Sequence, residues 1–330
     1  MSLLTNIVVG SAYIKIMSDN SGLEKNLSRT QKKLKEFADK ASNLGNALLK
    51  LAPIGLAIGH MTKTFQEFDD RMRMVKAVTG ATAKQFDLLT AKAKKLGRET
   101  RFTAPQVADG MISLGRMGFS TKEIDNAIKP VMDLSTATGT ELATASEIAA
   151  NNMRVFDMRA SEMNETADLL SVTANGSAQN LVDLGEALKM AGPHAKNAGA
   201  DLKETCAALG ILANMGIRGS LAGTALGKSY KRLADPAVQD YLVQFGIRTV
   251  DAAGNLRRMR DILVEVGEVM RSMPSAQRIT FAEKIFDARG SLGGGILSGN
   301  MGNYDEFLKK LDNASGEAAR IAREMEDGIG

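Results

Sequence analysis

The chain has 330 residues, of which 44% are apolar, so it can bury a core in one large domain or two ordinary ones. Its 42 Lys and Arg residues nearly balance 38 Asp and Glu residues, and the net charge of +4 arises within residues 1–50. A protein that binds nucleic acid would usually carry a denser basic face, so this charge distribution does not favour that class. A single cysteine, Cys206, excludes an internal disulfide and a cysteine-based zinc site, and the sequence shows neither a secretory signal nor an apolar run long enough for a bilayer.

The first part of the chain predicts a short strand followed by long helices. The stretch "GSAYIKIMSD", residues 10–19, alternates in the manner of a strand. Apolar residues then recur at spacings of four and three from Leu23 to Leu51, which is the seam of a coiled coil. Past Pro53 a second helical ladder runs from Ile54 to Val75. Such an apolar seam serves either self-association or packing within the chain, because small residues widen it and opposite charges do not pair across it.

From residue 100 to 216 the chain repeats loosely, and each of three repeats is predicted to form two helices. Glu123, Glu162 and Glu204 open the second helix of each repeat, 39 and 42 residues apart. Thr103 with Gln106 and Ser120 with Glu123 have the spacing of capping boxes. Glycines stand near the predicted helix ends, at positions 118, 139, 176, 199 and 216. The middle of the protein is therefore expected to be a stack of helical hairpins.

Further helices are predicted after Gly219, over residues 221–234, 237–245, 255–273 and 275–288. The stretch "FGIRTVDAAGNLRRM" predicts a small extended excursion with a turn at Ala253, Gly254 and Asn255. Residues 288–302 are rich in glycine and predict a loop, and a last amphipathic helix is expected from Asp305 to Glu326. The sequence then stops without a closing element, which predicts a fragment of a longer protein.

The stretch "AGTALGKSYKRL", residues 222–233, ends in the Gly-Lys-Ser of a phosphate-binding loop. Such a loop needs a glycine five places before that Gly and a buried strand in front of it, but position 222 is Ala and the preceding residues leave a helix. A steric role is favoured instead, in which Ala222, Gly223, Ala225 and Gly227 let neighbouring backbones approach closely. Lys228, Lys231 and Arg232 are then expected to be solvated charges on the exposed flank of the helix.

No catalytic, cofactor-binding or metal-binding residue is predicted. His60 and His194 are the only histidines and neither has a nearby acid and nucleophile; His60 is expected on an apolar helix flank and His194 in a turn after Pro193. Cys206 lies on a predicted apolar helix face and is expected to be a buried, inert thiol. A glycosidase pair among the carboxylates would show only in three-dimensional geometry.

Long ordered stretches resemble the core region of phage tail tape measure proteins, from about Phe65 to Gly290. They include "FDDRMRMVKAVTGATAKQFDLLTAKAKKLGRETRFTAPQVADGM" and "LGEALKMAGPHAKNAGADLKETCAALGILANMGIRGSLAGTALGKSYKRLADP". "YIKIMSDNSGLEKNLSRTQKKLKEF" is also similar to the beginning of such proteins, and "GSLAGT" lies in a hallmark region of the family.

The resemblance implies a non-enzymatic virion protein that sits in the lumen of the tail tube, sets tail length and leaves before the DNA during ejection. It implies assembly in the host cytoplasm with the tail tube protein, tail assembly chaperones and tail tip or baseplate proteins. Family members act in several copies, commonly as trimers, and no sequence-specific contact with nucleic acid is implied. A contact with the host membrane is expected only through downstream segments.

The chain is shorter than the family pattern implies. A tape measure protein works by its extended length, and 330 residues would reach only about 500 Å even if wholly helical. The chain is therefore interpreted as the N-terminal folded part of a tape measure protein, mainly all-α. Residues 1–80 are expected to hold the strand and long helices, 81–290 the hairpin core, and 291–330 a glycine-rich loop and a last helix that leads into a missing region. The alternatives are a helical-repeat scaffold that binds peptides, a cell-wall hydrolase, and a tail-like particle of a defective prophage.

Overall fold

The computed structural model describes residues 65–327. By its contacts the chain divides into two compact units, 1–67 and 68–330, and nearly all of the described residues belong to the second. The expected strand, the heptad seam, Pro53 and His60 lie outside the described residues. The division predicted at residues 80 and 290 stays a prediction.

The all-α expectation is confirmed for the described part of the chain, which contains helices and one isolated antiparallel bridge between Val250 and Leu256. A first helix covers residues 65–79. The later helices are α4 (Ala83–Glu99), α5 (Ala104–Arg116), α6 (Thr121–Thr138), α7 (Leu142–Val155), η1 (Ala160–Glu162), α8 (Met163–Asn175), α9 (Leu181–Asn197), α10 (Leu202–Asn214), α11 (Gly219–Leu233), α12 (Pro236–Val243), α13 (Met259–Arg271), α14 (Ser275–Gly290), η2 (Ser291–Gly295), α15 (Ile296–Gly299), α16 (Met301–Asp312) and α17 (Glu317–Asp327).

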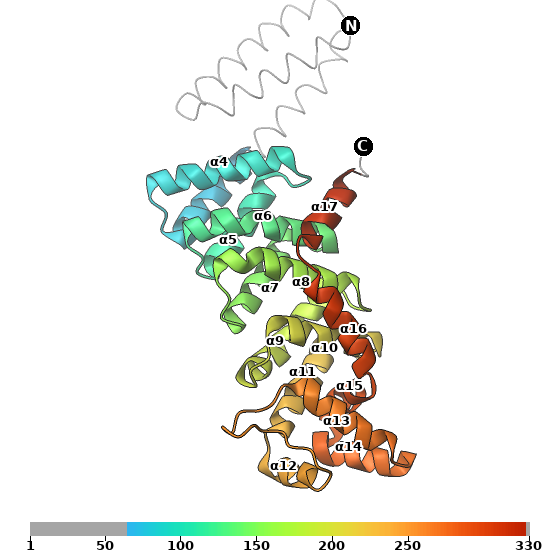
Figure 1. The fold of residues 1–330 in the computed structure, drawn as a ribbon. Coiled ribbons are helices and arrows are strands. Elements are labelled where there is room, and N and C mark those ends of the chain that lie inside the picture. The colour runs from blue at the N-terminus through green and yellow to red at the C-terminus, as the bar shows by residue number, and fades with distance from the viewer. Residues whose placement is uncertain (1–64, 328–330) are drawn as a thin grey trace, which may run out of the picture. The chain divides into compact units, whose positions relative to one another are not determined.

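The helices up to α11 form a stack of hairpins in two rows. In one row α5, α7, α9 and α11 pack side by side, and in the other α4, α6, α8 and α10 do the same. Figure 1 shows the two rows descending from α4 to α11. Each hairpin buries an apolar stripe that recurs every three or four residues, which is why the periodicity in the sequence predicted these helices.

Helices of the first row lie parallel and nearly in register. Glycines on one helix face the previous helix of the row at an almost constant separation in sequence: Gly115 faces Val78, Gly185 faces Ile148 and Gly192 faces Val155, each 37 residues apart. Gly223 of α11 faces Ala187 of α9, 36 residues apart. The repeat is therefore more regular in space than the spacing of the predicted helix starts suggested.

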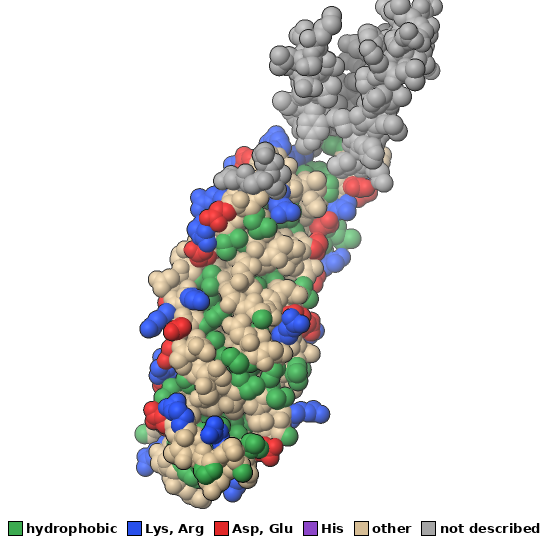
Figure 2. All heavy atoms as spheres, turned by 90° about the vertical axis from the view of Figure 1, so that its right-hand side faces the viewer, with side chains coloured by type: hydrophobic (Ala, Val, Ile, Leu, Met, Phe, Trp, Pro, Cys, Tyr) green, Lys and Arg blue, Asp and Glu red, His purple; other side chains and the backbone are tan. Residues whose placement is uncertain are grey.

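The chain then turns and runs back along the second row. Helices α12–α14 pack at the α11 end of the stack. Helices α15 and α16 then return mainly over α10, and α17 continues over α8 and α6. Figure 2 views the molecule from the right-hand side of Figure 1, and on this face the Lys and Arg side chains are scattered and interleaved with Asp and Glu. The face thus carries no continuous basic stripe of the kind that nucleic-acid binders use.

The helix starts use the caps that the sequence indicated. The hydroxyls of Thr103 and Ser120 accept from the backbone N–H of Gln106 and Glu123, whose side chains return to the cap residues. The predicted excursion is also confirmed: it carries the bridge from Val250 and turns at Gly254, which has a φ of +84°. The helix after it begins at Met259 rather than at residue 255, because the returning arm of the excursion occupies the residues before it.

Two predictions for the last part of the chain were wrong. Apart from Asn300, residues 288–302 are helical in α14, η2, α15 and α16 rather than a loop, because their glycines let the backbone pack against α11 and Phe286. The expected last helix is two helices, α16 and α17, separated at Asn313–Gly316, where Gly316 has a φ of +80°. The apolar periodicity continues across this break, so the sequence pattern did not reveal it.

Candidate interaction surfaces

Helix α11 packs on α9 through the glycine- and alanine-rich stretch that resembles a phosphate loop. A Cβ on Gly223 would lie 2.2 Å from the carbonyl oxygen of Ala187, and one on Gly227 would lie 2.7 Å from Cδ2 of His194. Ala222 is fully buried beside them. The steric interpretation is confirmed, because glycine is what allows the two backbones to lie this close. The stretch lies inside a helix and its serine, Ser229, is fully buried, so it cannot cradle a phosphate.

Ser229 joins α11 to the glycine-rich run of η2. Its Oγ lies 2.9 Å from the carbonyl oxygen of Ala225 and 3.1 Å from that of Gly290, and it accepts a hydrogen bond of 2.8 Å from the N–H of Gly294. A Cβ on Gly293 would lie 2.7 Å from the carbonyl carbon and oxygen of Ala225. The two glycine-rich stretches therefore form one close-packed seam, which explains why neither needs a bound ligand to account for its composition.

The expectation of solvated charges on the flank of α11 was wrong for two of three residues. Nζ of Lys228 lies 3.6 Å from a carboxylate oxygen of Asp287. The guanidinium of Arg232 donates to the carbonyl oxygens of Ile285 (3.1 Å) and Lys284 (2.9 Å) and pairs with Asp235 at 2.6 Å. These cations tie α11 to α14, whereas Lys231 is exposed as expected.

Asp287 is the strained residue of this contact, with a φ of +58° inside α14. Its Oδ1 accepts hydrogen bonds from the N–H groups of Arg289 (2.8 Å) and Gly290 (2.9 Å). Partial burial works to raise the pKa of Asp287, but these bonds and Lys228 outweigh it and lower the pKa. The carboxylate therefore holds the kink at which α14 gives way to η2.

Of the three residues His60, His194 and Cys206 that were singled out in the sequence, the last two lie within described helices. Cys206 is fully buried on α10, as expected, and burial raises the pKa of its thiol to about 12; that the thiol is inert stays a prediction. His194 lies within α9, because Pro193 does not end that helix, so its expected turn was wrong. Partial burial and then Lys231 lower the pKa of His194. Among the described residues no group of acidic, histidine or cysteine side chains could hold a metal ion.

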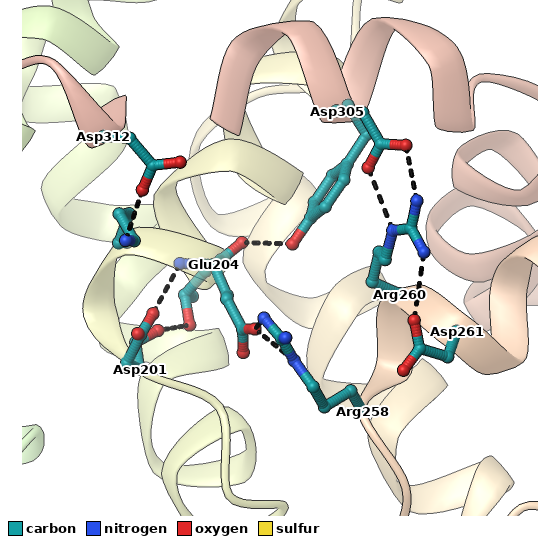
Figure 3. Close-up of polar contacts among 10 residues, drawn as sticks. Asp201, Glu204, Arg258, Arg260, Asp261, Asp305 and Asp312 are labelled. Atoms are coloured by element: carbon teal, nitrogen blue, oxygen red, sulfur yellow. Dashed lines mark hydrogen bonds and ion pairs between the residues drawn. The ribbon is translucent and has the colours of Figure 1, made fainter. Parts of the chain in front are cut away.

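A polar junction ties the returning helices to α10 and α13 (Figure 3). Glu204 pairs with Arg258 from the start of α13, and its backbone carbonyl accepts a 3.3 Å hydrogen bond from the hydroxyl of Tyr304 on α16. The guanidinium of Arg260 binds both carboxylate oxygens of Asp305, at 3.0 and 2.7 Å. The hydrogen bond and charge of Arg260 lower the pKa of Asp305. This bidentate geometry is the strong form of a charge-assisted pair.

Two further contacts hold the return. Lys203 of α10 binds Asp312 of α16 at 2.5 Å. Asp168 of α8, only 6% exposed, accepts hydrogen bonds from the N–H groups of Gly316 (2.7 Å) and Ala318 (2.9 Å). It therefore caps the N-terminus of α17 from another helix, where a negative charge is favoured. Sequence reasoning missed these residues, since the partners stand 45 to 150 positions apart.

One open hollow of about 450 Å³ lies over α5, at the first end of the stack. Its walls come from helix 65–79 and from α7, and its floor from α5. Its lining residues are Asp70, Arg71, Met74, Asp109, Ile112, Ser113, Arg116, Glu141, Ala143 and Glu147. Arg71 binds both carboxylate oxygens of Asp109, at 2.8 and 2.9 Å, across the hollow's edge. Such a mixed apolar and acidic hollow can receive a side chain or a helix, but it holds no constellation for catalysis.

Among the described helices none is both long and apolar enough to cross a membrane. The close contacts of α11 with α9 and η2 account for the glycine-rich stretches, and several of the ion pairs lie at the junctions between helices. The described helices thus form a closely packed stack, and the hollow over α5 lies at its first end.

Comparison with known proteins agrees with this picture of a structural stack. A family model described as phage-related minor tail protein matches residues 90–287. The tape measure protein of Pneumococcus phage Dp-1 is 29% identical over 337 aligned residues, which cover 97% of this chain and 29% of that protein. The probable tape measure protein of Escherichia phage P2 is 26% identical over 305 residues, or 90% of this chain and 37% of that protein.

No solved structure matches the chain. The chain spans about three tenths of the length of the first relative and less than two fifths of the second. The family match lies inside the region, Phe65 to Gly290, where the sequence resembled tape measure proteins, and it includes more than half of the chain. On that extent of similarity, this chain belongs to the family of phage-related minor tail proteins.

Proposed function

We propose that this chain is the compact, structural part of a tape measure protein of a phage tail. The observation that carries the proposal is the similarity to the Dp-1 tape measure protein along 97% of the chain. A helical stack of this kind would by itself also suit a peptide-binding scaffold. The similarity favours the tail protein, and nothing observed favours a scaffold or a cell-wall hydrolase.

The compact fold limits how much this part of the chain could contribute to the length of a tail. A straight helix adds about 1.5 Å per residue, whereas each stacked hairpin lengthens the stack only by the distance between neighbouring helices of one row, about 10 Å. The 37-residue repeat would thus contribute about 10 Å as a stack and about 55 Å as one continuous helix. We therefore infer that the described stack serves as an assembly element, and that extended segments of the full-length protein supply the ruler.

We also propose a place and partners for the protein. It would assemble in the host cytoplasm with tail assembly chaperones and the tail tip or baseplate, and would lie in the lumen of the tube once the tail tube protein polymerises. It would act without catalysis, and residues 1–80 would contribute to self-association. If light scattering finds residues 1–330 monomeric at high protein concentration, the proposed self-association through residues 1–80 is refuted.

Tail length measured by electron microscopy tests the ruler function. A helical insertion of 60 residues after the codon for Gly330, in the phage gene that encodes this chain, should lengthen tails by about 90 Å. The same insertion at the exposed turn Ala253–Gly254 is the matched control and should leave tail length unchanged, because it bulges from the stack. Tails of unchanged length after the first insertion would refute the ruler function.

A further inference from the structure

The hollow over α5 has an apolar floor and carboxylates on both walls. Ile112 and Ser113 of α5 are buried at its base, 8% and 4% exposed, and Met74 stands 44% exposed on one wall. The lining of the hollow carries four carboxylates and two guanidinium groups, so its net charge is −2. Glu141 is engaged in capping α7, and Asp109 is engaged with Arg71. The other two acidic side chains are therefore the ones available to a partner.

Those two are Asp70 on the wall formed by helix 65–79 and Glu147 on the wall formed by α7, and neither has an ion-pair partner among the described residues. The Ser113 hydroxyl likewise makes no hydrogen bond within the part of the chain that the structure describes, although the residue is almost fully enclosed and lines the hollow. The floor of the hollow therefore offers a hydroxyl group that can form a hydrogen bond beside apolar surface.

Helix α4 carries a stripe with the complementary chemistry. The exposed positions Lys84, Leu88, Ala91, Lys95 and Arg98 recur at spacings of four, three, four and three, so they share one face of the helix. Leu88 is 51% exposed at the centre of the apolar part, and cations stand at both ends. The opposite face of α4, with Leu89, Ala93 and Leu96, is already buried in the chain's own core, so the stripe is turned away from it.

We propose that the α4 stripe of one copy of this chain docks in the hollow over α5 of a second copy. Leu88 would enter against Ile112 and Met74, while Lys84 and Lys95 would face the carboxylates of Asp70 and Glu147. The match is one of charge and of shape: an apolar centre between cations meets an apolar floor between carboxylates. This contact does not depend on the proposed role in tail length.

The contact would be heterologous, because the stripe and the hollow are different surfaces of the same chain. A pair of copies would therefore still offer one free stripe, on one copy, and one free hollow, on the other, so the assembly would close into a ring or extend as a filament. Since α4, α5 and α7 all lie at the first end of the stack in Figure 1, the α12–α14 end would stay free for other contacts.

A disulfide between copies tests the contact directly in the full chain. Leu88→Cys and Ala143→Cys are prepared as separate single variants and mixed, so that any bond between the two positions joins different copies. The native thiol of Cys206 is buried, with its pKa raised to about 12, and does not compete. A mixed disulfide, identified by mass spectrometry after mild oxidation, is expected. Val243→Cys, 55% exposed at the far end of the stack, replaces Ala143→Cys in the matched control and should give no bond.

Charge exchange then tests the chemistry of the contact. In the Ala143→Cys chain, Asp70→Lys with Glu147→Lys should lower the yield of the mixed disulfide about tenfold, since like charges would face each other across the contact. Adding Lys84→Glu and Lys95→Glu to the Leu88→Cys chain should restore the yield.

The control for charge exchange uses two exposed residues elsewhere, Glu268→Lys and Lys231→Glu, which should leave the yield unchanged. Circular dichroism confirms that every variant is folded. The proposal is overturned if no mixed disulfide forms above the Val243→Cys control. It is also overturned if the bond survives charge reversal unchanged, or if the exchanged charges fail to restore it.

Discussion

Replacing Gly223 by alanine tests whether the close approach of α9 and α11 holds the stack together. The new Cβ would lie 2.2 Å from the carbonyl oxygen of Ala187 and 2.8 Å from its Cα and carbonyl carbon. These are backbone atoms in the middle of α9, so no side-chain rotation relieves the clash. The helices would have to separate by about 1 Å, which breaks van der Waals contacts along the whole seam.

The expected change in stability is the balance of two opposed effects. Overpacking of a close contact costs about 3 kcal/mol, whereas alanine in a helix interior gains about 1 kcal/mol over glycine. Gly223→Ala should therefore lower the free energy of unfolding by about 2 kcal/mol, which corresponds to a fall of roughly 4–8 °C in Tm for a unit of this size.

Chemical denaturation followed by circular dichroism measures this change, and hydrogen exchange at α9 and α11 localises it. Gly302→Ala is the matched control, because Gly302 is a helical glycine of α16 whose Cβ would meet nothing within 4 Å. That variant should be unchanged or slightly more stable. If Gly223→Ala proved as stable as Gly302→Ala, α9 and α11 would not be held by the close contact inferred from their geometry.

Four further outcomes are expected. Asp168→Ala should lower the free energy of unfolding by about 1 kcal/mol and increase hydrogen exchange in α17, which loses its cap. Ser229→Ala should lower it by about 2 kcal/mol, measured by urea denaturation, since it leaves the N–H of Gly294 unpaired in the core. The lowered pKa of Asp305 means that its contribution to stability is present above about pH 4 and is lost as the pH falls through its folded pKa; the Tm values of the protein and of Asp305→Asn should therefore converge in acid. The thiol of Cys206 should react with a thiol reagent at pH 8 only after unfolding in urea.

Each of these outcomes has a result that would contradict it. Unchanged exchange in α17 would mean that packing alone fixes that helix. A Ser229→Ala variant as stable as the parent would mean that the N–H of Gly294 finds another acceptor. A Tm difference for Asp305→Asn that does not shrink as the pH falls below about 4 would show that its effect is steric rather than electrostatic. A thiol that reacts in the native state would place Cys206 at a site that opens readily.

The helices themselves were predictable because their causes are local. An apolar residue every three or four positions, a hydroxyl or carboxylate at the start and a glycine near the end are sufficient to place helices such as α5, α6 and α10. The steric role of Gly223 could also be anticipated, because the stretch lacked the spacing that a phosphate loop requires. The exposed stripe of α4 follows the same periodicity.

The glycine-rich residues 288–302 show where local reasoning fails. Each glycine costs about 1 kcal/mol in a helix relative to alanine, so composition favoured a loop. The structure makes them helical because Gly293 and Gly294 fit against Ala225 and Phe286, where any Cβ would clash. Contact with α11 thus outweighs the local propensity, and that contact joins residues more than 60 positions apart.

The sequence by itself determined the helical class, the hairpins and the family, since periodicity, caps and long ordered stretches are properties of neighbouring residues. Only the tertiary structure decided the register of the rows, the return of α15–α17 over α10, α8 and α6, and the polar contacts of Arg258, Arg260 and Asp168. The hollow over α5 was likewise decided only by the tertiary structure, because three helices contribute its walls and floor. The physical reason is that a charge or a glycine has many acceptable partners in a sequence, and only the packed backbone brings one of them within hydrogen-bonding or van der Waals distance.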